Sequence, residues 1–211
     1  MTIFGRSISD VILMIVPLLM SLSVHEFAHA YVANRLGDPT PKERGRLTLN
    51  PLAHLDLLGT LCILMTFFIG LAKPVPVDPR YFRNPVTGMS IVAAAGPLSN
   101  LALAIILALA IRFVVGSESW EGVPLFFRDP IANMLYIAFY LNLGLCLFNL
   151  IPIPPFDGFR VLSCVLPRET VLFLERGSLP IMLVFFVLFV ATGAVGRVLW
   201  PLIRSIASFL L

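Results

Sequence analysis

Charged side chains are scarce in this 211-residue sequence: they make up 13% of it, compared with about 25% in an average soluble domain. Hydrophobic residues make up 58%, and the mean hydropathy is +0.94. Asp, Glu, Lys and Arg are absent from residues 11–25, 57–72, 84–111, 130–156 and 178–196. A membrane-spanning helix needs about 20 mainly apolar residues, so several of these stretches can cross a bilayer. The sequence therefore excludes an ordinary soluble domain and indicates an integral membrane protein.

Cysteine is equally scarce. Cys62, Cys146 and Cys164 are odd in number, far apart, and set in or beside apolar runs. This pattern excludes a disulfide framework, and we interpret the three as small packing residues. The net charge is only +3, and the basic residues lie between apolar runs, where they set membrane orientation. We expect a lipid bilayer and no nucleic acid as partner, and the sequence does not predict the oligomeric state.

The apolar runs predict an all-α polytopic membrane protein, a helical bundle of four to six membrane segments. We expect one membrane domain over residues 1–211, with a core at 7–160 and a C-terminal part at 161–211. That C-terminal part consists of an interfacial helix and a last membrane helix that begins near Pro180. The other expected elements are helices over 7–36, 86–115, 131–151 and 159–176, and short strands near 47–50 and 75–77.

The apolar run at residues 58–72 is short. Its 15 residues make a helix of roughly 22 Å, compared with a hydrocarbon core of about 30 Å. Basic clusters flank it, with Arg35, Lys42, Arg44 and Arg46 on one side and Lys73, Arg80 and Arg83 on the other. Both clusters favour the cytoplasm, so the run must enter and leave on one side. We expect a re-entrant or β-hairpin element, and a full crossing is the alternative.

The first apolar helix contains His25-Glu26-Phe27-Ala28-His29. Residues four apart share a helix face, so both imidazoles can reach one metal ion. Glu26 is offset by about 100° and can reach a metal-bound water as general base. A buried polar network is the alternative. Because ionisable groups in a membrane are costly and usually functional, we favour the metal site.

A catalytic zinc ion usually takes three protein ligands and keeps one position open for water. The sequence offers two candidates for the third ligand, His54 and Asp157. Asp157 follows a long apolar helix and a proline cluster that would unwind the end of that helix. The alternative for Asp157 is an ordinary helix-ending turn at the membrane interface.

Taken together, the motifs resemble those of the site-2 protease family of intramembrane metalloproteases. His-Glu-x-x-His at residues 25–29 is followed by Asn-x-x-Pro-x-x-x-x-Asp-Gly at 149–158. Gly-Pro-Leu-Ser-Asn at 96–100 matches a third segment typical of the family. Residues 50–56 and 72–77 match segments of its compact prokaryotic members, the type without a PDZ or CBS module.

The resemblance implies a membrane-embedded zinc metalloendopeptidase with one Zn²⁺ ion per chain. It implies that His25, His29 and Asp157 bind the ion and that Glu26 activates water for peptide-bond hydrolysis. It further implies that Asn149 binds the substrate strand or polarises the scissile carbonyl, and an uncharged amide donor suits that role at membrane depth. The alternative for Asn149 is a hydrogen bond between helices.

Three further polar residues have weaker assignments. His54 and Asp56 could gate the site or contact a metal ligand, and an interfacial turn is the alternative for both. Asn100 could support a ligand or bond to a neighbouring helix, and Gly96 is expected to help kink its helix beside Pro97.

We therefore expect an enzyme that cleaves single-pass transmembrane proteins. His29 lies about seven residues, or roughly 10 Å, from the helix end that carries basic residues. This depth predicts a multi-pass protein of the cell membrane with its active site nearer the cytoplasmic side. The alternative function is a non-catalytic metal-binding membrane scaffold or a transporter, although transport favours polar groups spread along a pathway.

Overall fold

The computed structural model describes residues 2–3, 6–54, 74–193 and 195–211, and its elements are helical apart from one short strand pair. Thr2–Ile3 (β1) and Arg6–Ser7 (β2) pair in antiparallel fashion at the N-terminus. The helices are α1 (Ile8–Arg35), α2 (Thr40–Glu43), α3 (Pro51–His54), η1 (Pro79–Tyr81), α5 (Pro85–Ala110), η2 (Ile111–Val115), α6 (Glu118–Glu121), α7 (Leu125–Asn149), α8 (Asp157–Leu162), α9 (Arg168–Arg176), α10 (Ser178–Ala191), η3 (Val195–Leu199) and α11 (Trp200–Leu210).

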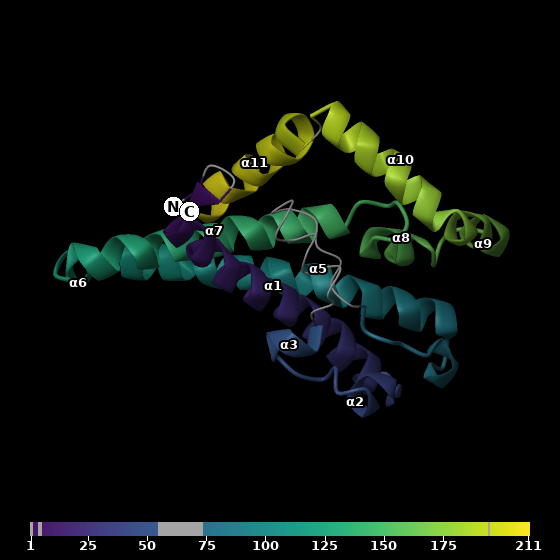
Figure 1. Ribbon diagram of the computed structural model, residues 1–211. Coiled ribbons are helices and arrows are strands. Elements are labelled where there is room, and N and C mark those ends of the chain that lie inside the picture. Colours follow the sequence, from purple (N-terminus) through teal and green to yellow (C-terminus); the bar gives the residue numbers. More distant parts are fainter. Residues whose placement is uncertain (1, 4–5, 55–73, 194) are drawn as a thin grey trace.

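Three long helices, α1, α5 and α7, pack against one another and form the body of the protein (Figure 1). The start of α5 is set by Asn84, whose side chain accepts hydrogen bonds from the backbone N–H groups of Val86 and Thr87. Small side chains on α5, among them Ala104 and Ala108, pack in the core beside the larger Phe139 and Leu143 of α7. Small residues let helix backbones approach closely. Such close packing holds helices together in a membrane, where lipid tails are as apolar as the side chains and no hydrophobic effect drives association.

The lengths and compositions of the helices confirm the predicted membrane class. Three helical segments are long and apolar enough to span a bilayer: Leu13–Arg35, Pro85–Val115 and Leu125–Asn149. A fourth span is added if α9 and most of α10, which are bent relative to each other by 69°, are counted as one. Four is the lower bound expected from the sequence. The lipid-facing side of α5 leaves Leu98 and Ile106 more than half exposed, as expected for a helix surrounded by hydrocarbon rather than water.

The end of α1 and the beginning of α5 lie at the same end of the bundle. Ala33 of α1 is buried against Phe82 and Val92, with Leu36 and Val77 packed around them. The buried Asp38 carboxylate ties the two segments together, because it accepts hydrogen bonds from the backbone N–H of Thr40 at 2.9 Å and of Asp78 at 2.8 Å. The described basic residues that follow α1 and precede α5 therefore share this end. The 58–72 run and Lys73 lie outside the described residues, as does the choice between a hairpin and a crossing.

Five predicted elements differ in the structure. Helix α7 begins at Leu125, six residues earlier than expected, with Pro130 inside it. The helix expected over 159–176 is two helices, since α8 ends at Leu162 and α9 begins at Arg168 with Pro167 as its N-cap. Residues 47–50 and 75–77 are irregular rather than strands. The last span is only 14 residues as α10, and it is followed by a turn in which Gly193 has φ +64°.

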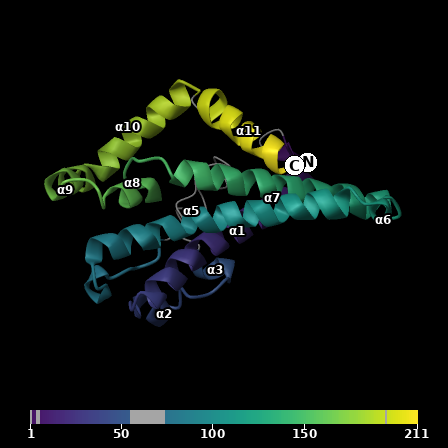
Figure 2. The same cartoon turned by 180° about the vertical axis from the view of Figure 1, so that it is seen from behind.

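Helices α10 and α11 meet at an angle and form an arch, as Figures 1 and 2 both show. Helix α11 is anchored by Ile203 and Ala207, which are buried in the core with α5 and α7. Helix α10 contacts the end of α7 and the following loop through aromatic side chains. Phe185 and Phe189 lie with ring centroids 5.7 Å from Phe156 and 5.9 Å from Phe148, respectively. The C-terminal part of the chain therefore touches the loop that follows α7.

Candidate metal centre

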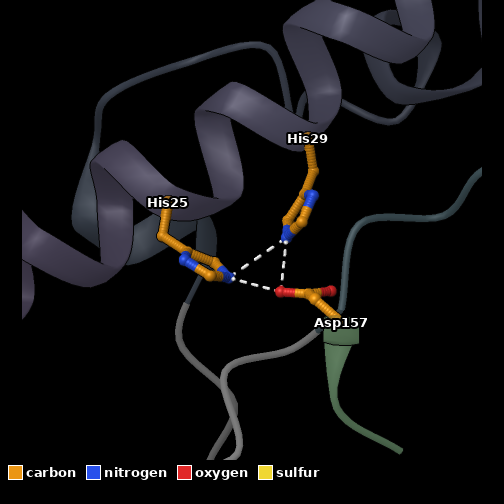
Figure 3. A group of neighbouring side chains, drawn as sticks. All are labelled: His25, His29 and Asp157. Atoms are coloured by element: carbon orange, nitrogen blue, oxygen red, sulfur yellow. Dashed lines mark hydrogen bonds and ion pairs between the residues drawn. The ribbon is translucent and has the colours of Figure 1, made fainter. Parts of the chain in front are cut away.

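His25, His29 and Asp157 meet at one point inside the bundle (Figure 3). The two histidines are one turn apart on α1, and their Nε2 atoms lie 3.1 Å from each other. The Asp157 Oδ2 atom, at the first residue of α8, lies 3.1 Å from His25 Nε2 and 3.3 Å from His29 Nε2. The sequence prediction that the two histidines share a face with each other is confirmed, and Asp157, rather than His54, joins them.

The spacing of these three atoms fits a tetrahedral metal ion. With zinc–ligand bonds of about 2.0–2.2 Å, neighbouring ligand atoms in a tetrahedron lie about 3.3–3.5 Å apart. The three observed separations, 3.1, 3.1 and 3.3 Å, form nearly such a triangle. Three ligand atoms on one side leave the fourth tetrahedral position for water or substrate.

The hydrogen bonds of the imidazoles also fit a metal. His29 Nδ1 lies 2.7 Å from the Val92 carbonyl oxygen, which can only accept, so this nitrogen carries the proton. His25 Nδ1 lies 2.9 Å from Asn100 Oδ1, which likewise accepts. In the neutral imidazoles the lone pairs are then on Nε2, and both face a carboxylate oxygen. Three electron-rich atoms aimed at one point repel one another, and a cation at that point turns the repulsion into binding.

Gly96 of α5 lets both imidazole rings lie close against this helix. A Cβ atom at this position would lie 2.6 Å from both Nε2 and Cε1 of His25, and closer still to His29 Nε2. Any side chain at this position would occupy the volume in front of both imidazoles. From the sequence, Gly96 is expected to help kink its helix; the structure also places it against the candidate ligands.

Asp157 reaches the site because α7 stops at Asn149 and the following loop turns back. Pro152, Pro154 and Pro155 prevent the helix from continuing. Gly158 allows a tight approach, since a Cβ there would overlap the Leu150 carbonyl. Helix α8 is also tied to α5, because Ser90 Oγ donates a hydrogen bond to the Arg160 carbonyl oxygen at 3.0 Å.

The electrostatic surroundings keep the Asp157 carboxyl ionised. Burial acts to raise the pKa of Asp157, but the facing imidazoles of His25 and His29, when they are protonated, outweigh burial through their hydrogen bonds and charge and hold this pKa well below its usual range. An ionised carboxylate is the form that binds a metal ion. Glu26 is also buried, at 8% exposure, and its carboxylate is near enough to act electrostatically on His29.

Among the other predicted residues, Asn100 contacts His25, whereas Asn149 and His54 make local hydrogen bonds. Asn149 is half-buried and donates a hydrogen bond to Leu145 O, one turn back on its own helix, at 2.9 Å. His54 is buried on α3 and its Nε2 bonds to Thr48 O at 2.8 Å, which makes it part of a local turn. Asp56 lies outside the described residues.

Comparison with known proteins gives one family. A family model described as Peptidase family M50 matches residues 13–191. The chain is 40% identical over 194 residues to "Putative zinc metalloprotease YwhC" of Bacillus subtilis, which covers 91% of this chain and 86% of the relative. It is 35% identical over 159 residues to "Putative zinc metalloprotease Rip2" of Mycobacterium tuberculosis, covering 72% of this chain but only 56% of Rip2.

A more distant relative has the same kind of name. "Zinc metalloprotease MJ0392" of Methanocaldococcus jannaschii is 27% identical over 169 residues, and the match covers 80% of this chain and 38% of that protein. The chain thus spans most of YwhC but only part of the longer relatives. No solved structure matches the chain significantly.

Proposed function

Since this chain belongs to peptidase family M50, the site-2 protease family, we propose that it is an intramembrane endopeptidase that hydrolyses peptide bonds of single-pass transmembrane proteins. The family and its relatives make the chain a zinc metalloprotease with a protein substrate, and its apolar helices make it a multi-pass membrane protein. The location of the reaction and the kind of substrate are our proposal. The observation that carries it is the convergence of His25, His29 and Asp157 within a bundle of apolar helices.

In this proposal His25, His29 and Asp157 hold one Zn²⁺ ion per chain. Bound zinc supplies a water molecule of lowered pKa and polarises the scissile carbonyl. The Glu26 carboxylate accepts a proton from the attacking water as the new C–O bond forms. Glu26 then delivers that proton to the amide nitrogen as the C–N bond breaks, so that a carboxylic acid and an amine are released. Both steps suit a buried carboxylate that follows a ligand directly in sequence.

Asn149 is proposed to donate a hydrogen bond to the carbonyl oxygen of the substrate, where negative charge develops. Its amide has two N–H bonds, and one of them is engaged with Leu145 O. The second can therefore serve the substrate without breaking the helix contact. A neutral donor avoids the cost of burying another charge in the membrane.

We place the site in the cytoplasmic half of the cell membrane. His29 is six residues before Arg35, the last residue of α1, which is roughly 9 Å along a helix. The same end of the bundle carries exposed Lys42, Arg44 and Arg80, and basic residues favour the cytoplasmic side. We also propose that residues 1–211 act as one membrane metalloprotease domain.

The test is Glu26→Gln, with Glu43→Gln as matched control because Glu43 undergoes the same chemical change on the exposed helix α2. Both proteins and the wild type are purified in detergent, their zinc content is measured, and each is reconstituted in liposomes with a single-pass model substrate. We expect one zinc ion in all three and cleavage by the wild type and Glu43→Gln only. A general base contributes about 10²–10⁴-fold, so the loss should be at least of that order.

Three outcomes would contradict the proposal or a part of it. Wild-type protein that binds no zinc would contradict the metal site. A zinc-loaded wild type that cleaves no transmembrane substrate would favour the alternative, a metal-binding scaffold or transporter. Equal cleavage by Glu26→Gln and the wild type would remove Glu26 from the mechanism.

A further inference from the structure

Both candidate histidine ligands are oriented by the same helix, α5. Its residues Val92, Gly96 and Asn100 are spaced four apart and so lie on one face, which we term the orienting face. Val92 accepts a hydrogen bond from His29 Nδ1 through its backbone oxygen, and Asn100 accepts one from His25 Nδ1 through its side chain. Gly96, between them, leaves the space in front of both Nε2 atoms.

Asn100 is the residue of the orienting face whose hydrogen-bond acceptor lies in the side chain, so a substitution can remove that acceptor. A backbone carbonyl is present whatever residue stands at position 92, whereas the acceptor for His25 exists only because residue 100 is an asparagine. The Asn100 side chain is fully buried, and its Nδ2 has no hydrogen-bond partner within the described residues. Leaving a buried N–H unpaired is unfavourable, so this amide is a poor choice for packing alone.

We propose that Asn100 is a positioning residue for the metal ligand His25, an inference that rests on the proposed zinc site. Asn100 Oδ1 keeps the proton of His25 on Nδ1 and fixes the ring plane, so that the Nε2 lone pair faces the ion. Without this acceptor the imidazole can take the other tautomer, in which Nε2 carries the proton and cannot bind a metal. Groups that orient metal ligands in this way typically alter metal affinity by about 10–100-fold.

The neutral amide also suits the charge of the site. The described ligands are two imidazoles and one carboxylate, which together carry one negative charge when the imidazoles are neutral, and Glu26 adds a second nearby. A carboxylate at position 100 would still accept the Nδ1–H hydrogen bond, but it would add a third negative charge inside the bundle. Asparagine provides the acceptor without that charge.

The chain contains a matched control in Asn142 of α7. This amide is as fully buried as Asn100 and also has one unpartnered atom, Oδ1, within the described residues. Its Nδ2 donates to Ser21 Oγ and to Ala138 O, each at 2.8 Å, and none of these groups is a candidate ligand. Replacing either asparagine with leucine removes a buried amide from the bundle, but only one replacement removes a hydrogen bond from a ligand.

The test compares the zinc affinities of Asn100→Leu, Asn142→Leu and the wild type in competition with a chromogenic chelator. We expect Asn100→Leu to bind zinc about 10–100-fold more weakly, and Asn142→Leu to stay within about threefold of the wild type. Asn100→Asp should recover most of the affinity, because it restores the acceptor. The visible spectrum of bound Co²⁺ should change in Asn100→Leu and not in Asn142→Leu.

The results separate this inference from the proposed function. If the wild type binds no zinc, the proposed site itself is wrong. If the wild type binds zinc and Asn100→Leu binds it as tightly, or if Asn100→Asp is as weak as Asn100→Leu, Asn100 does not position His25. Should Asn100→Leu fail to fold, as judged by its thermal transition, Asn100→Ala removes the same acceptor with less bulk and is read by the same criteria.

Discussion

The space provided by Gly96 leads to a sharp prediction for Gly96→Ala. The added methyl carbon would lie 2.6 Å from His25 Nε2. Since a carbon and a nitrogen in contact normally lie about 3.4 Å apart, the imidazole must move by roughly 0.8 Å. Metal sites hold ligand distances to within about 0.2 Å, so a shift of this size breaks the site. We expect zinc affinity to fall by about 100-fold or more, and cleavage to fall with it.

The fold itself should survive this substitution. Overpacking a core typically costs about 1–3 kcal/mol. Alanine in place of glycine inside a helix gains roughly 0.5–1 kcal/mol. The net loss in the free energy of unfolding is therefore about 0–2.5 kcal/mol, which a thermal melt in detergent can measure without zinc.

The control for Gly96→Ala is Gly144→Ala on α7. A Cβ atom at position 144 would lie 3.9 Å from Ile203 Cδ1, an ordinary contact. We expect this variant to bind zinc and cleave substrate as the wild type does, with stability higher by about 0.4–1 kcal/mol. Zinc binding by Gly96→Ala at wild-type affinity and stoichiometry would refute the reasoning, because the methyl group cannot share the volume in front of both imidazoles with an ion.

Two further predictions concern residues away from the ligands. Asp38→Ala leaves the N–H groups of Thr40 and Asp78 without their acceptor. We therefore expect the free energy of unfolding to fall by about 2–4 kcal/mol in a denaturation experiment, with zinc affinity unchanged. An unaltered unfolding transition would contradict the role of Asp38 in connecting α1 to the segment before α5. Asn149→Leu should reduce kcat for transmembrane substrate by about 10²–10³-fold while zinc content stays at one per chain, and a kcat equal to that of the wild type would exclude the proposed hydrogen bond to the substrate carbonyl.

The histidine pair could be predicted from the sequence because residue type and spacing indicate metal binding. His25 and His29 are a helical turn apart. Residue type alone leaves His54 and Asp157 both open as the third ligand, and it is the resemblance to site-2 proteases that implies Asp157. The contribution of α5 could not be predicted in the same way. Gly96 acts through the absence of a side chain, and Val92 acts through a backbone oxygen that every residue possesses. Only the positions of these groups in space show what they do.

The errors in the predicted secondary structure also have a physical cause that only the positions of groups in space reveal. Leu47-Thr48-Leu49 is typical of a strand by composition, but in the structure the Thr48 carbonyl pairs with a side chain rather than with a neighbouring strand. His54 Nε2 bonds to the Thr48 carbonyl, and Arg46 donates to the Ala53 carbonyl. The start of α7 was placed too late because Asp129 and Pro130 look like a helix boundary. A helix end at the interface tolerates both residues, since water and headgroups are available there.

The origin of the ligands in the chain has a consequence for biosynthesis. His25 and His29 emerge from the ribosome early, within the first apolar helix, whereas Asp157 follows only after α5 and α7 have been made. A nascent chain that has inserted its first helix therefore has two of the three groups and cannot yet form the centre. The loop that carries Phe156 also contacts Phe185 of α10, which is translated still later. The complete metal centre can therefore form in the membrane only late in the synthesis of the chain.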